Sequence, residues 1–114
     1  MEIVTRPWGH YKVLYETEHT KVKELTVAPG QRLSYQYHQH RHEHWVVVTG
    51  VATVTLDGLT IDYGVRKHLD VPLGSKHRLA NNTEEPLVII EIQTGLYFGE
   101  DDIIRLDDDY DRIN

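Results

Sequence analysis

The chain has 114 residues, a length that fits one domain with a single core. It contains no cysteine, which excludes thiolate catalysis, iron–sulfur clusters and disulfides, so any metal must be held by His, carboxylate or amide groups. The net charge is −6, and the segment from Glu100 to Arg112, with seven acidic and two basic residues, carries five of these charges. This balance argues against nucleic acid as a partner, because electrostatic capture of nucleic acid needs a basic surface.

The N-terminal residues Met1 to Arg6 lack the apolar continuation of a signal peptide. No run of the sequence approaches the roughly 18 apolar residues of a membrane-spanning helix. We therefore expect a soluble, cytoplasmic protein that has no membrane partner. No linker, low-complexity segment or repeat divides the chain, so residues 1–114 are expected to form a single domain.

Most of the chain alternates between apolar and polar residues, as strands do. The apparent strands are separated by turn formers, among which Asp57-Gly58 is typical of a tight hairpin. The first twenty residues are expected to form an arm or an edge strand. The tail from Glu100 to Ile113 is expected to be irregular or to carry a short helix. The expected strands are 11–15, 21–28, 32–38, 45–49, 51–56, 59–63, 77–81 and 86–93.

Eight or more short strands with almost no helix predict an all-β protein, either an antiparallel barrel or a jelly roll. Such a small barrel has a mouth in which a ligand can sit.

Metal-ligating side chains are concentrated between Gln36 and His44, directly before the apolar run 45–48. Gln36 and His38 are two residues apart on one expected strand, so their side chains share a face, and Glu43 begins the next strand after a turn at 39–42. His77 follows another turn and is the natural fourth ligand. These nitrogen and oxygen donors suit a divalent Zn, Mn, Co, Fe or Ni ion and leave one or two positions open.

The spacing of these residues resembles the two sequence motifs of the cupin superfamily. The resemblance implies a double-stranded β-helix, that is, a jelly-roll barrel. The first motif is matched with Gln where the general pattern has His, and the second is matched without that departure. The matching residues are Gly30, Gln36, His38, Glu43 and Gly50, and then Pro72, Gly74, His77 and Asn81.

Within that superfamily the chain resembles the type II phosphomannose isomerases. Gln36-x-His38, the segment 41–48 and the segment 90–105 carry the similarity, whereas 64–71 and 82–85 depart from the family. The resemblance implies metal-dependent conversion of mannose 6-phosphate to fructose 6-phosphate, with a sugar phosphate as the small-molecule partner and a homodimer as the assembly. In that family the module often follows a mannose-1-phosphate guanylyltransferase domain. These 114 residues contain no such domain, so nucleotidyl transfer is not expected of them.

Aldose–ketose isomerisation through an enediol needs a cation beside the developing oxyanion and a base that returns the proton. His40 and His44 are candidates for the base because imidazole titrates near neutrality, and Glu43 remains open. Arg41 is the candidate clamp for phosphate or enediolate. The alternative for Arg41 is an ion pair with Glu100 or Asp101.

Two other functions remain open at this point. One is a non-catalytic cupin that binds a metal and recognises a sugar or sugar nucleotide, and the other is a different cupin enzyme such as an epimerase or a dioxygenase. Histidine ligands also predict that metal occupancy falls below about pH 6, where an unperturbed imidazole gains its proton.

Overall fold

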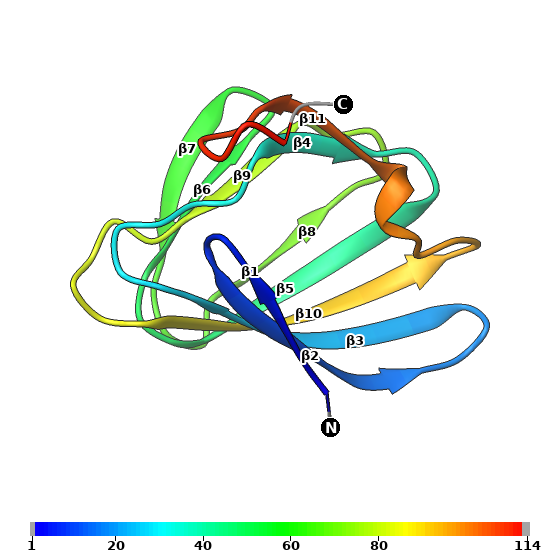
Figure 1. Ribbon diagram of the computed structural model, residues 1–114, viewed down its shortest axis with the longest axis horizontal. Coiled ribbons are helices and arrows are strands. Elements are labelled where there is room, and N and C mark those ends of the chain that lie inside the picture. The colour runs from blue at the N-terminus through cyan, green and yellow to red at the C-terminus, as the bar shows by residue number, and fades with distance from the viewer. Residues whose placement is uncertain (1, 113–114) are drawn as a thin grey trace.

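The computed structural model describes residues 2–112 and consists of two antiparallel sheets that face each other across a common interior (Figure 1). One sheet has six strands in the order β1-β2-β3-β10-β5-β8, and the other has five in the order β11-β4-β9-β6-β7. This architecture confirms the predicted all-β jelly roll. The bounds are β1 Ile3–Arg6, β2 Gly9–Glu16, β3 Thr20–Val27, β4 Tyr35–His38, β5 Arg41–Thr49, β6 Ala52–Leu56, β7 Leu59–Tyr63, β8 His68–Val71, β9 His77–Ala80, β10 Leu87–Gly95, the 3₁₀ turn η1 Glu100–Asp102, and β11 Ile103–Asp107.

The interior changes from apolar at one end to polar at the other. On β10 every second residue is buried, and the apolar Leu87 and Ile89 are followed by Glu91 and Gln93. The neighbouring β5 runs in the opposite direction and makes the same change in reverse. Its buried residues are Arg41, Glu43, Trp45 and Val47. The apolar end holds the sheets together, and the polar end is the part of the barrel that can bind a ligand.

Turns occur where the sequence predicts them. Asp57 and Gly58 join β6 to β7 with φ angles of 48° and 86°, and two positive φ angles in succession are typical of a type I′ hairpin. Gly95 ends β10 with φ 155° against the backbone of β5. A Cβ atom at this position would overlap the carbonyl oxygen of His40, so Gly95 permits the close approach of the two strands at the polar end.

Three features of the fold differ from the sequence prediction. Strand β8 was not expected, because its four residues give too short an alternation to stand out. Strand β5 begins at Arg41, whereas the sequence predicts that Arg41 lies in a turn at 39–42 and that the strand starts at Glu43. The tail is not helical beyond the turn η1, and Ile103–Asp107 pairs with β4 as an edge strand. The end of the expected tail helix, Ile113, lies outside the described residues. Within residues 2–112 no helix is long and apolar enough to cross a membrane.

The tail is fixed to the barrel by a buried carboxylate. The backbone N–H groups of Gln39 and His40 donate to Asp102 at 3.0 and 3.1 Å, and Asp102 is only 5% exposed. The turn between β4 and β5 and the start of β11 are therefore held together beside the polar end. The expected N-terminal edge strand is also present, as β1 paired with β2.

Candidate metal centre and adjoining pocket

Three of the four predicted metal ligands meet in the interior. His38 ends β4, Glu43 lies near the start of β5, and His77 begins β9. Their candidate ligand atoms all lie within 4.8 Å of one another, and the three residues are 2%, 4% and 1% exposed. Pairing of β4 with β9 brings His38 and His77 together in the five-stranded sheet. The turn between β4 and β5 then brings Glu43 of the six-stranded sheet next to them.

Both imidazoles have a nitrogen that no protein group satisfies. The Nε2 atoms of His38 and His77 are buried and have no hydrogen-bond partner in the described part of the chain. The Nδ1 atom of His77 is 2.9 Å from the carbonyl oxygen of Ser75, which can only accept, so Nδ1 carries the proton and Nε2 has a free lone pair. Buried polar atoms are almost always satisfied, so this pair of unpartnered nitrogen atoms fits a bound cation.

The pKa values of the two histidines favour the form that binds metal. Burial lowers the pKa of His38 to about 4, although the nearby Glu43 carboxylate opposes the shift. Burial also lowers the pKa of His77 below its ordinary value, again against the effect of Glu43. Both imidazoles are therefore neutral at pH 7, as ligation requires.

Glu43 is held in the charged form by donors on its own strand. The Nε atom of Arg41 donates to Oε2 at 3.0 Å, and the Nε1 atom of Trp45 donates to Oε1 at 2.9 Å. Burial alone would raise the pKa of Glu43, but His38, Arg41 and His77 lower it to about 2. Arg41 is thus paired with Glu43 and not with Glu100 or Asp101, and it fixes the carboxylate at the metal centre.

Gln36 lies beside the cluster in the same layer. Its Cα is paired with that of His77 across β4 and β9, and it shares a face of β4 with His38. The Oε1 atom of Gln36 accepts a hydrogen bond from Ser34 at 2.8 Å. Its position is compatible with the fourth ligand role, which stays a prediction.

The two histidines considered as the catalytic base do not join the cluster. The Nδ1 atom of His40 is 3.2 Å from Asp102, and its side chain is 52% exposed at the turn before β5. His44 is 2.7 Å from Asp70 on the face of β5 opposite Glu43, because neighbouring strand residues point to opposite faces. Neither lines the pocket beside the metal centre.

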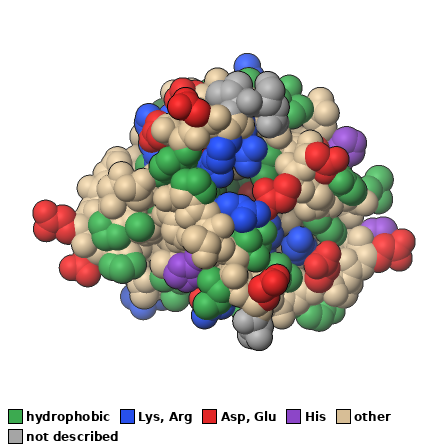
Figure 2. All heavy atoms as spheres, in the orientation of Figure 1, with side chains coloured by type: hydrophobic (Ala, Val, Ile, Leu, Met, Phe, Trp, Pro, Cys, Tyr) green, Lys and Arg blue, Asp and Glu red, His purple; other side chains and the backbone are tan. Residues whose placement is uncertain are grey.

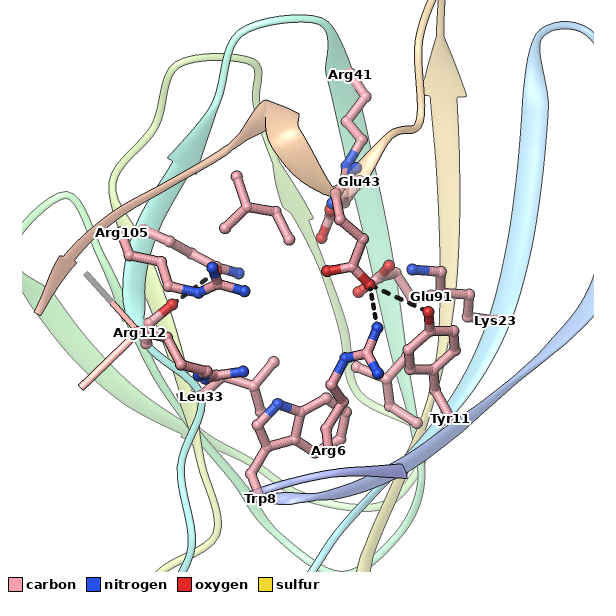
Figure 3. Close-up of a pocket in the computed structure, with 15 residues that line it drawn as sticks. Arg6, Trp8, Tyr11, Lys23, Leu33, Arg41, Glu43, Glu91, Arg105 and Arg112 are labelled. Atoms are coloured by element: carbon pink, nitrogen blue, oxygen red, sulfur yellow. Dashed lines mark hydrogen bonds and ion pairs between the residues drawn. The ribbon is translucent and has the colours of Figure 1, made fainter. Parts of the chain in front are cut away.

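That pocket opens from the metal centre between the two sheets. Gln36, Arg41 and Glu43 line one part of it, and the rest is lined by side chains from β1, β2, β3, β10, the tail and the residues just before β2 and β4. In Figure 3, Arg105 and Arg112 point inward from one side, and Lys23 and Glu91 lie on the other. Basic and acidic side chains also gather around the centre of this face in Figure 2.

The pocket carries more positive than negative charge. Among the described residues its charged side chains are the cations Arg6, Lys23, Arg41, Arg105 and Arg112 and the carboxylates Glu43, Glu91 and Glu100. Arg6 pairs with Glu100, Arg41 with Glu43, and Arg112 with Asp108. Within residues 2–112, Lys23 and Arg105 have no ion pair within 4.0 Å, and the Nε atom of Arg105 is buried without a partner. An anionic group can therefore bind here.

Three charged residues that line this pocket, namely Lys23, Glu91 and Arg105, are not selected by the sequence analysis. The alternation of the strands could have indicated two of them. On β3 the inward positions are Lys23, Leu25 and Val27, and Lys23 is the charged one. On β10 the inward position of Glu91 is likewise charged. A charged residue at an inward position of a strand points to a functional interior. Arg105 could not be found in this way, because the tail was not expected to form a strand.

Comparison with known proteins identifies the family of this chain. A family model described as mannose-6-phosphate isomerase C-terminal matches residues 1–108. The alginate biosynthesis protein AlgA of Pseudomonas aeruginosa is 50% identical over 109 residues, which are 96% of this chain and 23% of that protein. The mannose-1-phosphate guanylyltransferase ManC of Salmonella typhimurium is 46% identical over 110 residues, with the same two coverages. The chain thus spans less than a quarter of the length of these relatives.

Solved structures are similar in fold at lower sequence identity. KdgF from a Halomonas species superposes with a TM-score of 0.76 at 17% identity, covering 89% of this chain and 90% of that one. The capsular polysaccharide assembling protein CapF from Staphylococcus aureus gives a TM-score of 0.79 at 20% identity, covering 93% of this chain and 31% of that one. The cupin domain of Cnp3 from Schizosaccharomyces pombe gives 0.73 at 15% identity, covering 75% and 64%. The fold is a cupin barrel, and the chain belongs to the family of mannose-6-phosphate isomerase C-terminal domains.

Proposed function

We propose that this domain is a metal-dependent aldose–ketose isomerase that converts mannose 6-phosphate to fructose 6-phosphate. The observation that carries the proposal is a buried cluster of two neutral histidines and one glutamate that adjoins a cationic pocket. The cluster suits a cation, and the pocket suits the anionic phosphate of a sugar. Membership of the family and the mannose phosphate chemistry that the names of relatives describe add support.

His38, Glu43 and His77 would hold the divalent ion, with the amide oxygen of Gln36 as the fourth ligand. Zn, Mn, Co, Fe and Ni all accept this mixture of nitrogen and oxygen donors. A cation bound here would stabilise the negative charge that develops on the substrate oxygens during enediol formation. Arg41 and Trp45 keep the Glu43 carboxylate oriented toward the site through their hydrogen bonds.

Arg105 is the cation that would bind the phosphate. It lies on the side of the pocket opposite Lys23 and Glu91 in Figure 3, and no ion pair neutralises it in the described residues. A phosphate held there would leave the carbonyl end of the open-chain sugar for the other side of the pocket, which Glu43 of the cluster also lines. Arg41 is a further cation of the pocket, but its Nε atom already donates to Glu43.

The test is isomerase activity of the metal-loaded chain. We expect mannose 6-phosphate to yield fructose 6-phosphate in a coupled assay, and both chelator and His77→Ala to abolish the reaction and the bound metal. His19→Ala is the matched control, since His19 is exposed on the hairpin between β2 and β3. Binding of the sugar phosphate by metal-loaded wild-type protein without turnover would instead identify a sugar-recognition module. Oxygen uptake with Fe²⁺ would identify a dioxygenase.

A further inference from the structure

Glu91 is a carboxyl group in the pocket that the metal centre does not use. It lies on β10, and its Cα is paired with that of Lys23 on β3 and with that of Trp45 on β5. The residue is 6% exposed and lines the pocket together with Glu43. Figure 3 shows Glu91 and Lys23 next to each other on the side of the pocket below Glu43.

The three carboxyl groups of the pocket have different partners. Glu43 accepts from Arg41 and Trp45 and belongs to the metal cluster. Glu100 accepts from Arg6 at 2.9 Å and from Tyr11 at 3.1 Å, and although burial would raise its pKa, Arg6 lowers it. Glu91 accepts from the amide of Gln93 and has no cation within ion-pair distance among residues 2–112. Glu91 is thus the pocket carboxyl that is free to change its protonation state.

The surroundings of Glu91 favour that role at neutral pH. Burial raises the pKa of Glu91, and in the metal-free protein the negative charge of Glu43 acts in the same direction and brings it to about 7. Lys23 from β3 and Arg41 from β5 oppose the shift, as does the hydrogen bond from Gln93 on its own strand. A general base is most effective when its pKa lies near the working pH.

We propose that Glu91 is the catalytic base, which carries the proton between C2 and C1 of the sugar phosphate. Lys23 is a positioning residue that stabilises the carboxylate form of Glu91. This inference rests on the isomerase function proposed above. It replaces His40 and His44, which the fold directs away from the pocket.

The proton transfer is balanced within the substrate and Glu91. The Glu91 carboxylate takes the proton from C2, the electron pair of the C2–H bond forms the C1–C2 double bond, and the carbonyl electron pair moves to O1. The same carboxyl group then gives its proton to C1 as the carbonyl bond forms at C2. The proton of the O2 hydroxyl group passes to O1, so the product is an isomer and no other reactant is consumed.

The decisive variant is Glu91→Gln, which removes the titrating group and keeps its shape. We expect kcat to fall about 10³-fold with little change in KM or in bound metal, which is the size of a lost acid–base group. Exchange of the C2 hydrogen with solvent deuterium should disappear with it. Glu24→Gln is the control, because Glu24 lies on β3 but on the opposite face, beside Lys12.

A readout that does not depend on turnover follows the Glu91 carboxyl group directly. In difference infrared spectra of the metal-free protein, a protonated carboxyl band should appear as the pH falls through about 7 and should be absent from Glu91→Gln. Lys23→Met should raise the apparent pKa on the acid side of the kcat–pH profile by about one unit, because the variant loses a cation that favours the carboxylate form of Glu91. An unmoved limb would exclude this role of Lys23.

The outcomes separate this inference from the proposed function. If the metal-loaded wild-type protein does not isomerise mannose 6-phosphate, the proposed function is wrong. If the wild-type protein is active and Glu91→Gln keeps its kcat and its deuterium exchange, only the role of Glu91 is wrong.

Discussion

Replacing Glu91 by Gln should change how the stability of the metal-free protein depends on pH. In the folded protein the pKa of Glu91 is raised to about 7 from an ordinary value of 4.5. Between these two values the folded state binds more protons than the unfolded state. The contribution of Glu91 to stability is therefore present below pH 4.5 and is lost as the pH rises toward 7.

The size of this effect follows from the shift in pKa. Each pKa unit corresponds to about 1.4 kcal/mol, so the shift of Glu91 corresponds to a loss of about 3 kcal/mol across the window. No discount for solvent screening is needed, because the residue is only 6% exposed. The Gln variant cannot titrate and should not show this loss. Glu91→Gln should thus gain about 3 kcal/mol relative to the wild-type protein between pH 4.5 and 7.

Urea unfolding of metal-free wild-type and variant protein, in the presence of chelator, measures the difference at each pH. His38 and His77 titrate in the same window with the opposite sign, but they are present in both proteins and cancel in the comparison. Glu24→Gln, on the outer face of β3, should not reproduce the pH-dependent gain. A difference between Glu91→Gln and the wild-type protein that stays constant from pH 4.5 to 7 would refute the reasoning.

Three further predictions concern the metal centre and the phosphate. Because burial lowers the pKa of His38 to about 4, zinc affinity measured by calorimetry should be nearly constant from pH 8 to about 5 and fall only below it; a decline that begins near pH 6.5 would contradict this. Trp45→Phe removes a donor to Glu43 and should weaken zinc binding about tenfold, whereas unchanged affinity would show that this hydrogen bond does not support the site. Arg105→Met should raise KM for mannose 6-phosphate about tenfold or more without changing bound metal, and an equal effect of Arg32→Met, an exposed control, would exclude a specific phosphate contact.

The pH prediction for metal binding made from the structure differs from the one made from sequence. Histidine ligands with an unperturbed pKa would lose the metal below about pH 6. His38 and His77 are almost fully buried, so we expect protonation to compete with a bound metal only at lower pH. Burial is a property of the fold and is not readable from the spacing of the histidines.

The metal cluster could be predicted from sequence because its geometry follows from local rules. His38 and Glu43 flank one turn. His77 follows the turn at Pro72-Leu73-Gly74 and begins β9, which lies in the same sheet as β4. The same rules should have excluded His44, because a strand that turns Glu43 inward turns His44 outward. His40 could not be excluded in this way, since its orientation depends on Asp102, which is 62 residues away.

The sequence by itself determined the class of fold and the three residues of the buried His–Glu cluster. Alternation with a period of two, turn residues at regular intervals and the motif spacing are local properties, and local properties are sufficient for these conclusions. The tertiary structure alone decided the pocket, in which β3, β10 and the tail strand β11 bring Lys23, Glu91 and Arg105 together. It also decided their chemistry, because the proton affinity of a carboxyl group depends on burial and on charges contributed by strands distant in sequence.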